Sequence, residues 1–234
     1  MRRLAAAIRN DIYLQIRYGF YGVYLIVTVV YILLLKNIPD YFLSLALPFI
    51  IFSDPAFLGF YFIGGLVLLE KGENVLEYLV STPLREREYI FAKIVSLTIL
   101  ALLASLAVAF FTAAGHFKVW LLVAGVLLSS VFYTAIGFIA VARFRTVNEY
   151  LMSSLVYMTV LSLPLLDFFR LYQSWFFYLF PTQASLILIR GAFQGAEPWQ
   201  LAYGIIYLSL WIVLLFKWAG RAFYRFIILK EGAA

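Results

Sequence analysis

Long apolar runs, separated by short charged turns, constrain this chain more than any other feature of its sequence. A helix of about 20 apolar residues crosses the hydrocarbon core of a bilayer. Backbone polar groups find no water there, so a spanning segment must be helical or part of a closed barrel. The predicted spans cover about residues 20–35, 41–69, 82–115, 119–142, 150–164 and 199–218. The sequence therefore predicts an all-α integral membrane protein with six transmembrane helices.

The composition leaves no room for a separate soluble domain. The chain has 234 residues, a mean hydropathy of +0.96 and 13% charged residues. Such values exclude an ordinary soluble domain, and we expect residues 1–234 to form one transmembrane domain. Cysteine does not occur and His116 is the one histidine in the sequence, so neither a thiolate site nor a two-histidine metal site is predicted.

Residues 1–18 form a basic, amphipathic lead-in to the first span. Leu4, Ile8, Ile12 and Ile16 recur every four residues, with arginines between them. This pattern predicts an interfacial helix lying along the cytoplasmic leaflet. The alternative is that the arginines serve only as an orientation signal.

A carboxylate and a proline interrupt the second apolar run at Asp54 and Pro55. We favour an interpretation in which Asp54 caps a new helix that begins at Pro55, because a cap needs no buried unpaired charge. The alternative is an ion at a kink within one continuous span. A carboxylate at the bilayer centre costs roughly 2.5–3.5 kcal/mol on insertion scales, so Asp54 should face protein or water in both cases.

Residues 168–193 are apolar and aromatic, yet Arg170, Pro181 and Arg190 interrupt them. Two halves of about 12 residues are each too short to cross a bilayer. We therefore predict a re-entrant helix pair that dips from the outer face just before the last span and is shielded by protein.

The basic residues are distributed unevenly between the two predicted faces of the membrane. Fourteen of the 18 lie on one side: Arg2, Arg3, Arg9, Arg17, Lys71, Arg85, Arg87, Lys93, Arg143, Arg145, Lys217, Arg221, Arg225 and Lys230. The other four are Lys36, Lys118, Arg170 and Arg190. The positive-inside rule then predicts that both termini and the 70–93 loop lie in the cytoplasm. The net charge of +6 reflects topology, and no nucleic-acid partner is expected.

The 70–93 loop is far longer than a turn between two spans requires. Val75, Leu76, Leu79 and Val80 share one helical face, and Glu73 and Glu77 lie on another. One interpretation is a surface helix lying on the headgroups. The abundance of glutamate favours a second, a docking element for a soluble partner, because anionic lipid surfaces repel carboxylates. Pro83 suits the first position of the following helix.

This loop also carries a family resemblance. Glu73–Lys93, with the core EYLVSTPLREREYIFAK, resembles the cytoplasmic loop of type-2 ATP-binding-cassette (ABC) permeases. Ile51–Glu77 resembles permeases grouped with fluoroquinolone exporters. The resemblance implies a coupling helix docked on a separate ABC ATPase subunit, which would bind ATP and Mg, and pairing with a second permease copy or a homologous permease.

The resemblance also implies two sets of site residues. ATPase coupling would involve Glu73, Val75, Leu76, Glu77, Leu79, Val80, Pro83 and Arg85. The first, second and fifth spans line the dimer seam in that family, so candidate pathway residues are Asp54, Tyr61, Phe62, Tyr157 and Ser162.

Two functions follow from these patterns. The first is the permease subunit of an ABC exporter in the cell membrane, moving amphipathic or hydrophobic cargo, either drug-like or lipid-like, out of the cell. The second is a non-transporting membrane scaffold or sensor that docks an ATPase. An enzyme is not expected, because the sequence has no Gly-x-x-x-x-Gly-Lys phosphate loop and no clustered catalytic side chains. For the same reason we expect no cofactor in this chain.

Overall fold

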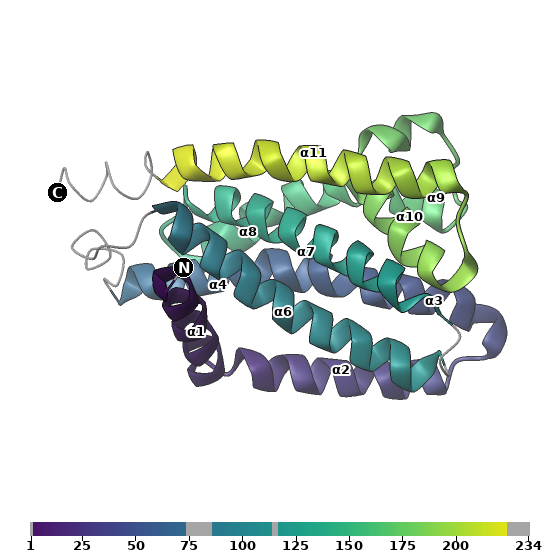
Figure 1. The fold of residues 1–234 in the computed structure, drawn as a ribbon, viewed down its shortest axis with the longest axis horizontal. Coiled ribbons are helices and arrows are strands. Elements are labelled where there is room, and N and C mark those ends of the chain that lie inside the picture. The colour runs from purple at the N-terminus through teal and green to yellow at the C-terminus, as the bar shows by residue number, and fades with distance from the viewer. Residues whose placement is uncertain (1, 74–85, 114–116, 224–234) are drawn as a thin grey trace.

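The computed structural model describes residues 2–73, 86–113 and 117–223, and every regular element in these ranges is helical (Figure 1). The elements are α1 (Arg2–Arg17), α2 (Phe20–Lys36), α3 (Asp40–Ser53), the π-helical turn η1 (Asp54–Leu58), α4 (Gly59–Gly72), α6 (Glu86–Thr112), α7 (Val119–Val141), α8 (Val147–Leu161), α9 (Leu165–Phe168), the 3₁₀ turn η2 (Trp175–Leu179), α10 (Pro181–Gln194) and α11 (Pro198–Phe223).

Four helical stretches in the described residues are long and apolar enough to cross a membrane. They are Tyr41–Gly72, Arg87–Thr112, Val119–Val141 and Pro198–Ala222, and the bent pair formed by α1 and α2 makes a fifth where the pair is counted as one span. The predicted fifth span corresponds to α8, which has 15 residues and a length of about 22 Å against a hydrocarbon core of about 30 Å. A multi-pass helical membrane protein is thus established, and the count of six spans stays a prediction.

Helix α7 occupies the centre of the bundle and packs against α4, α6, α10 and α11. Its sequence is apolar on every face, as expected of a helix surrounded by others. Tyr133 of α7 and Thr182 of α10 are both buried, and their hydroxyl oxygens lie 2.8 Å apart. This bond satisfies two polar groups that would otherwise destabilise the core.

The second apolar run is one continuous helix of 32 residues, in which α3, η1 and α4 follow one another. The backbone of Asp54 is helical (φ −58°, ψ −63°), and neither oxygen of its side chain accepts a hydrogen bond in the described part of the chain. The favoured interpretation of Asp54 as a helix cap is therefore wrong, and Asp54 lies within one continuous helix, as the alternative had it. A π turn accommodates Pro55, which has no amide hydrogen to donate.

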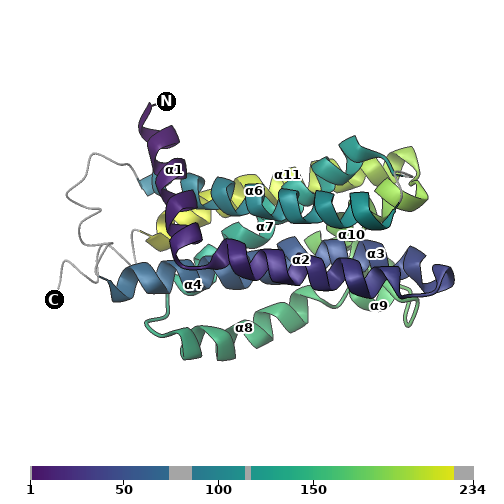
Figure 2. The same ribbon diagram turned by 90° about the horizontal axis from the view of Figure 1, so that it is seen from below.

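Helix α1 is separate from α2 and meets it at an angle of 68° (Figure 2). Gly19 makes this bend with φ of +79°, a conformation that glycine adopts without strain. Ile16 is 56% exposed, whereas Asp11 and Gln15 are buried. The predicted N-terminal helix exists, but polar side chains hold it to the bundle; its place in the lipid interface stays a prediction.

Residues 168–193 contain one turn and one helix, and the predicted pair of re-entrant helices is not confirmed. The turn η2 has five residues and α10 has 14. Most of α10 is buried where it packs against α3, α7 and α11. Protein therefore surrounds a helix too short to cross a bilayer, while its entry from the outer face stays a prediction.

Helix α8 buries Tyr150, Ser154 and Met158 against the bundle. The Tyr150 ring fills the space beside Gly64, where an added Cβ would lie 2.1 Å from a ring carbon. Its hydroxyl donates to the Phe60 carbonyl at 2.8 Å, and the two rings stack with centroids 5.6 Å apart. Several apolar residues on the other side of α8 are exposed, Met152 and Val156 most of all.

Candidate functional site

The predicted coupling loop, residues 70–93, begins and ends at two bonded side chains. Glu70 Oε1 at the end of α4 lies 2.6 Å from Lys93 Nζ in α6. Lys93 Nζ also lies 3.0 Å from Asp11 Oδ1 in α1, and the Tyr89 hydroxyl donates to the second Glu70 oxygen at 2.5 Å. We call these four residues the ion cluster. It fastens the two ends of the loop to each other and to the N-terminal helix.

The ion cluster is almost fully shielded from solvent. Lys93 is 0% exposed, Glu70 2% and Asp11 6%. Removing an ion from water costs several kcal/mol, which only close pairing and further hydrogen bonds can offset. Burial raises the pKa of the Asp11 carboxyl, and the neighbouring Lys93 ammonium acts in the opposite direction. Because both carboxylates share the Lys93 cation, the cluster depends on that one side chain.

Lys71, at the end of α4, bonds the end of another helix. Lys71 Nζ donates to the carbonyls of Ala142 and Phe144, at 3.2 and 3.1 Å, where α7 ends. A cation at a helix C-terminus is favourable because unpaired carbonyls give that end a partial negative charge. Lys71 therefore joins the end of α4 to the end of the central helix.

Glu73, the first predicted coupling residue, lies just after α4 and bonds the elbow between α1 and α2. It accepts a hydrogen bond from the Tyr18 hydroxyl at 2.6 Å. This bond to a carboxylate raises the pKa of Tyr18 to about 12. We call Glu70, Lys71 and Glu73 the α4 hub, since three side chains within four positions contact α6, α7 and the N-terminal segment.

The other predicted coupling residues lie outside the described part of the chain. They are Val75, Leu76, Glu77, Leu79, Val80, Pro83 and Arg85. Their role in docking an ATPase stays a prediction. On the two sides of this segment, Glu70 and Lys93 are buried and bonded to each other. A displacement of the segment would therefore be felt by both α4 and α6.

The structure divides the five predicted pathway residues among three places. Phe62 packs edge-on against Phe20 and Tyr24 of α2, with ring centroids 4.8 and 5.1 Å away. Tyr61 is half-buried and lies edge-on to Tyr150 of α8, at 6.4 Å.

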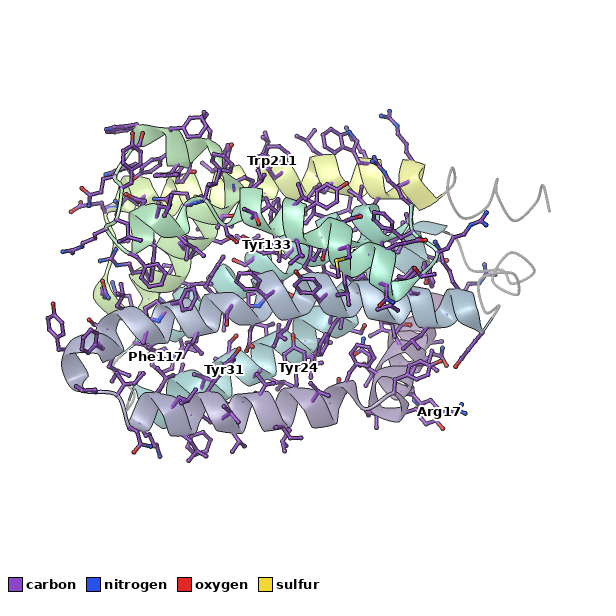
Figure 3. The ribbon with its side chains drawn as sticks, turned by 180° about the vertical axis from the view of Figure 1, so that it is seen from behind. Arg17, Tyr24, Tyr31, Phe117, Tyr133 and Trp211 are labelled. Carbon is purple, nitrogen blue, oxygen red and sulfur yellow. The ribbon has the colours of Figure 1, made fainter. Side chains whose placement is uncertain are left out.

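The remaining pathway residues lie on α8 and in the middle of the bundle. Tyr157 is 40% exposed on α8, and Ser162 follows the last residue of that helix. Asp54 is 1% exposed and within electrostatic range of Tyr24. Figure 3 shows Tyr24 and Tyr31 projecting from α2 towards the rest of the bundle.

Asp54 sits among other polar groups that lack partners. In the described residues, both Asp54 oxygens, the Tyr24 hydroxyl and the Thr134 hydroxyl are buried and make no hydrogen bond. Thr134 belongs to α7, which packs against η1. Buried polar atoms without a protein partner thus occur on α2, η1 and α7 in the described part of the chain, and such atoms are uncommon in folded proteins.

Sequence reasoning missed the ion cluster, although one signal was available. Lys93 interrupts an otherwise apolar helix, and an ionisable residue at such a position indicates a functional site with a partner. The sequence pattern places Glu70 in the loop, and it predicts no partner for Asp11, which lies outside the apolar repeat of its helix. Among the described residues, no group of three or more His, Cys, Asp or Glu side chains is placed to hold a metal ion.

Comparison with known proteins extends over nearly the whole chain. The profile of the fluoroquinolones export permease protein family matches residues 2–231. The chain belongs to this family. Two proteins named as fluoroquinolones export permeases, from two strains of Mycobacterium tuberculosis, are each 29% identical over 235 residues, covering 99% of this chain and 99% of the relative. Membership in the fluoroquinolones export permease family, together with the apolar helices, identifies a multi-pass membrane permease and confirms the resemblance that the 51–93 region predicted.

Proposed function

We propose that this permease is the membrane subunit of an exporter driven by a separate ABC ATPase, which binds ATP and Mg and docks on residues 73–85. The observation that carries the proposal is the α4 hub. Its bonds connect the start of the proposed docking segment to α6, to α7 and to the N-terminal helix. A force applied to that segment therefore acts on several helices together.

The proposed mechanism is a shift between two permease conformations. Closure of two ATPase subunits around nucleotide displaces the docked segments and favours one conformation of a permease pair. A shift from 1:99 to 99:1 needs about 5.5 kcal/mol of differential binding. The buried ion cluster suits this role, because a rigid base transmits a displacement instead of absorbing it.

The proposed pathway lies between two permease copies, since one copy has too few spans to enclose a channel. The exposed apolar side of α8, with Tyr157, would face the second copy. The relatives are named for the export of fluoroquinolones, and an aromatic, sparsely charged pathway suits planar or amphipathic drug-like cargo. We place the ATP-facing side, and both termini, in the cytoplasm on the basis of the positive-inside rule.

The test is a charge-reversal pair in the proposed docking segment. The double variant Glu77→Arg with Leu79→Arg should abolish co-purification of the proposed partner ABC ATPase. It should also reduce fluoroquinolone efflux from a susceptible host to the level of the vector control. Burial of the apolar face supplies roughly 1.5–3 kcal/mol per side chain, and an arginine on that face removes it.

A matched control places the same substitutions at the other end of the bundle. Glu197→Arg with Leu171→Arg changes two exposed residues and should leave both readouts at the wild-type level. ATPase binding that survives the Glu77 and Leu79 changes would refute the docking assignment. ATPase binding by the wild-type permease without fluoroquinolone efflux would favour the non-transporting scaffold instead.

A further inference from the structure

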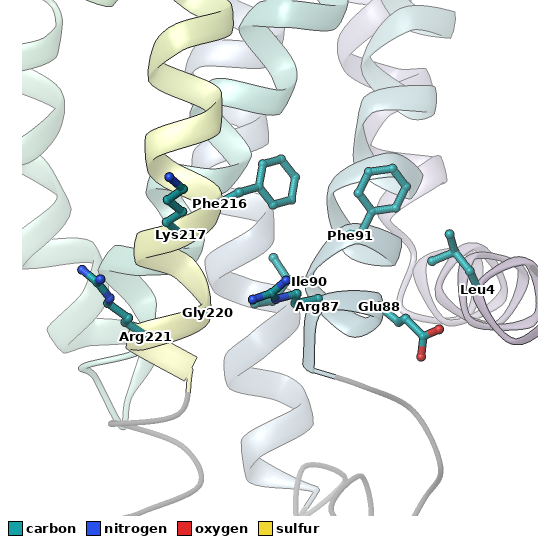
Figure 4. A pocket seen from close by; sticks show the side chains of 9 residues that line it. All are labelled: Leu4, Arg87, Glu88, Ile90, Phe91, Phe216, Lys217, Gly220 and Arg221. Carbon is teal, nitrogen blue, oxygen red and sulfur yellow. The ribbon is translucent and has the colours of Figure 1, made fainter.

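A cleft of about 1050 Å³ lies where the start of α6, the end of α11 and the N-terminal half of α1 meet (Figure 4). Leu4, Phe91 and Phe216 contribute apolar surface to it, and the two phenyl rings have centroids 6.2 Å apart. Phe91 is 42% exposed. A large aromatic side chain left open in this way indicates contact with an apolar molecule.

The same cleft is strongly basic. Arg87 of α6 and Lys217 and Arg221 of α11 line it, against the single carboxylate of Glu88. In Figure 4, Arg87 extends towards α11, whereas Glu88 lies on the side of α1. All three cations line the cleft, although Arg221 extends from α11 on the side away from α6 (Figure 4). An anionic group in the cleft would be attracted by these charges.

One face of α11 continues from the cations into exposed apolar residues. Lys217 and Arg221 are four residues apart, and Leu210 and Leu214 precede Lys217 by seven and three, so all four share a face. Leu210 is 56% exposed and Leu214 37%. This face has the polarity of a phospholipid, with charge at one end and hydrocarbon along the rest.

The cleft lies at one end of the helical bundle. Helix α1, which supplies Leu4, turns away from α2 by 68° and crosses that end (Figure 1). Trp218, next to Lys217, is 47% exposed. Tryptophan beside lysine and arginine is typical of the boundary between hydrocarbon and headgroups. This pattern favours a position of the cations near the level of lipid phosphates.

We infer that this cleft binds an anionic phospholipid, such as phosphatidylglycerol, with its phosphate at the basic lining formed by Arg87, Lys217 and Arg221 and its acyl chains against Phe91 and the leucine face of α11. Basic pockets between membrane helices at the cytoplasmic side recognise acidic headgroups in this way. A free anion would use the cations but leave the adjoining apolar surface uncovered, which favours the lipid as occupant. The lipid would hold α11 against α6 at the end that carries the α4 hub.

The experiment compares lipid retention by the full-length permease and two double variants. Each protein is reconstituted in phosphatidylcholine nanodiscs with a minor fraction of phosphatidylglycerol, and bound lipids are counted by native mass spectrometry. Lys217→Gln with Arg221→Gln should lower phosphatidylglycerol retention about fivefold per cation removed. Arg17→Gln with Arg145→Gln removes two exposed cations outside the cleft and should retain phosphatidylglycerol at the wild-type level.

Two further measurements separate lipid from other anions. Leu214→Gln keeps the cations and should still weaken phosphatidylglycerol retention, because acyl-chain contact is lost. Inorganic phosphate at millimolar concentration should fail to displace the lipid. Equal retention by the cleft variant and its control, equal retention of phosphatidylcholine and phosphatidylglycerol, or displacement by phosphate would each overturn the assignment.

Discussion

Two places in this permease bury carboxylates, and they treat them in opposite ways. In the ion cluster, Glu70 and Asp11 share the ammonium of Lys93 at 2.6 and 3.0 Å. In the middle of the bundle, Asp54 is 1% exposed and no described residue bonds either of its oxygens. The first carboxylates are satisfied in this conformation, and the second is not.

The two kinds of buried carboxylate differ in their effect on conformational change. A satisfied buried network specifies one arrangement, because any rearrangement leaves a charge without its partner. An unsatisfied polar group destabilises the conformation in which it is found and gains from a change that hydrates, protonates or pairs it. On this ground the ion cluster should resist rearrangement, and the environment of Asp54 should differ in any conformation that pairs or hydrates its carboxylate.

The largest expected effect comes from removing the shared cation. Lys93→Met leaves Asp11 and Glu70 buried without a positive partner and should lower the free energy of unfolding by about 3–5 kcal/mol. Denaturant unfolding of the purified protein in detergent measures it. Lys118→Met is the matched control; it changes an exposed lysine that directly precedes α7 and should change stability by less than about 0.5 kcal/mol.

The same comparison can be sharpened by removing the whole network. Apolar replacement of Asp11, Glu70 and Lys93 together should restore much of the stability lost in Lys93→Met, since no charge is left unpaired. Restoration accompanied by loss of efflux would support a role for the cluster in transmission. If Lys93→Met unfolds like the wild type, the cluster does not hold the loop base together.

An intermediate effect is expected at Lys71. Lys71→Met removes the bonds to Ala142 and Phe144 at the end of α7 and should cost about 1–3 kcal/mol, because bonds from a charged donor are stronger than neutral ones. Lys71→Arg keeps the charge and should lose less than half as much. The two variants can be ranked by the midpoint of thermal unfolding; equal losses would show that the position, and not the cation, matters.

Local sequence chemistry predicted the helices well and the polar contacts poorly. The expected fourth span, 119–142, matches α7 to within one residue, because Lys118 and Arg143 mark its ends within the sequence itself. Likewise the start of α2 at Phe20 and of α11 at Pro198 follow from turn residues beside them. Such boundaries depend on neighbours along the chain.

The errors arose where distant residues decide the structure. Asp54 followed by Pro55 is a local signal for a helix start, but packing of η1 against α7 keeps the helix continuous through a π turn. Lys93 and Asp11 are 82 residues apart in sequence, and no periodicity links them. The ends of the predicted coupling loop could be located from the sequence. The contacts among Asp11, Glu70 and Lys93 that join those ends could not.

The smallest effect on stability, and the most informative contrast, is expected at Asp54. Asp54→Asn should change the free energy of unfolding by no more than about 1 kcal/mol, in either direction, because the carboxylate makes no hydrogen bond to lose in this conformation. Efflux should fall at the same time if Asp54 acts in another conformation. Side-by-side unfolding and efflux assays with Lys93→Met test this. A loss of 3 kcal/mol or more at Asp54 would mean that its charge is paired in the native assembly, with a second copy as the nearest source of a partner, and the contrast between the two regions would disappear.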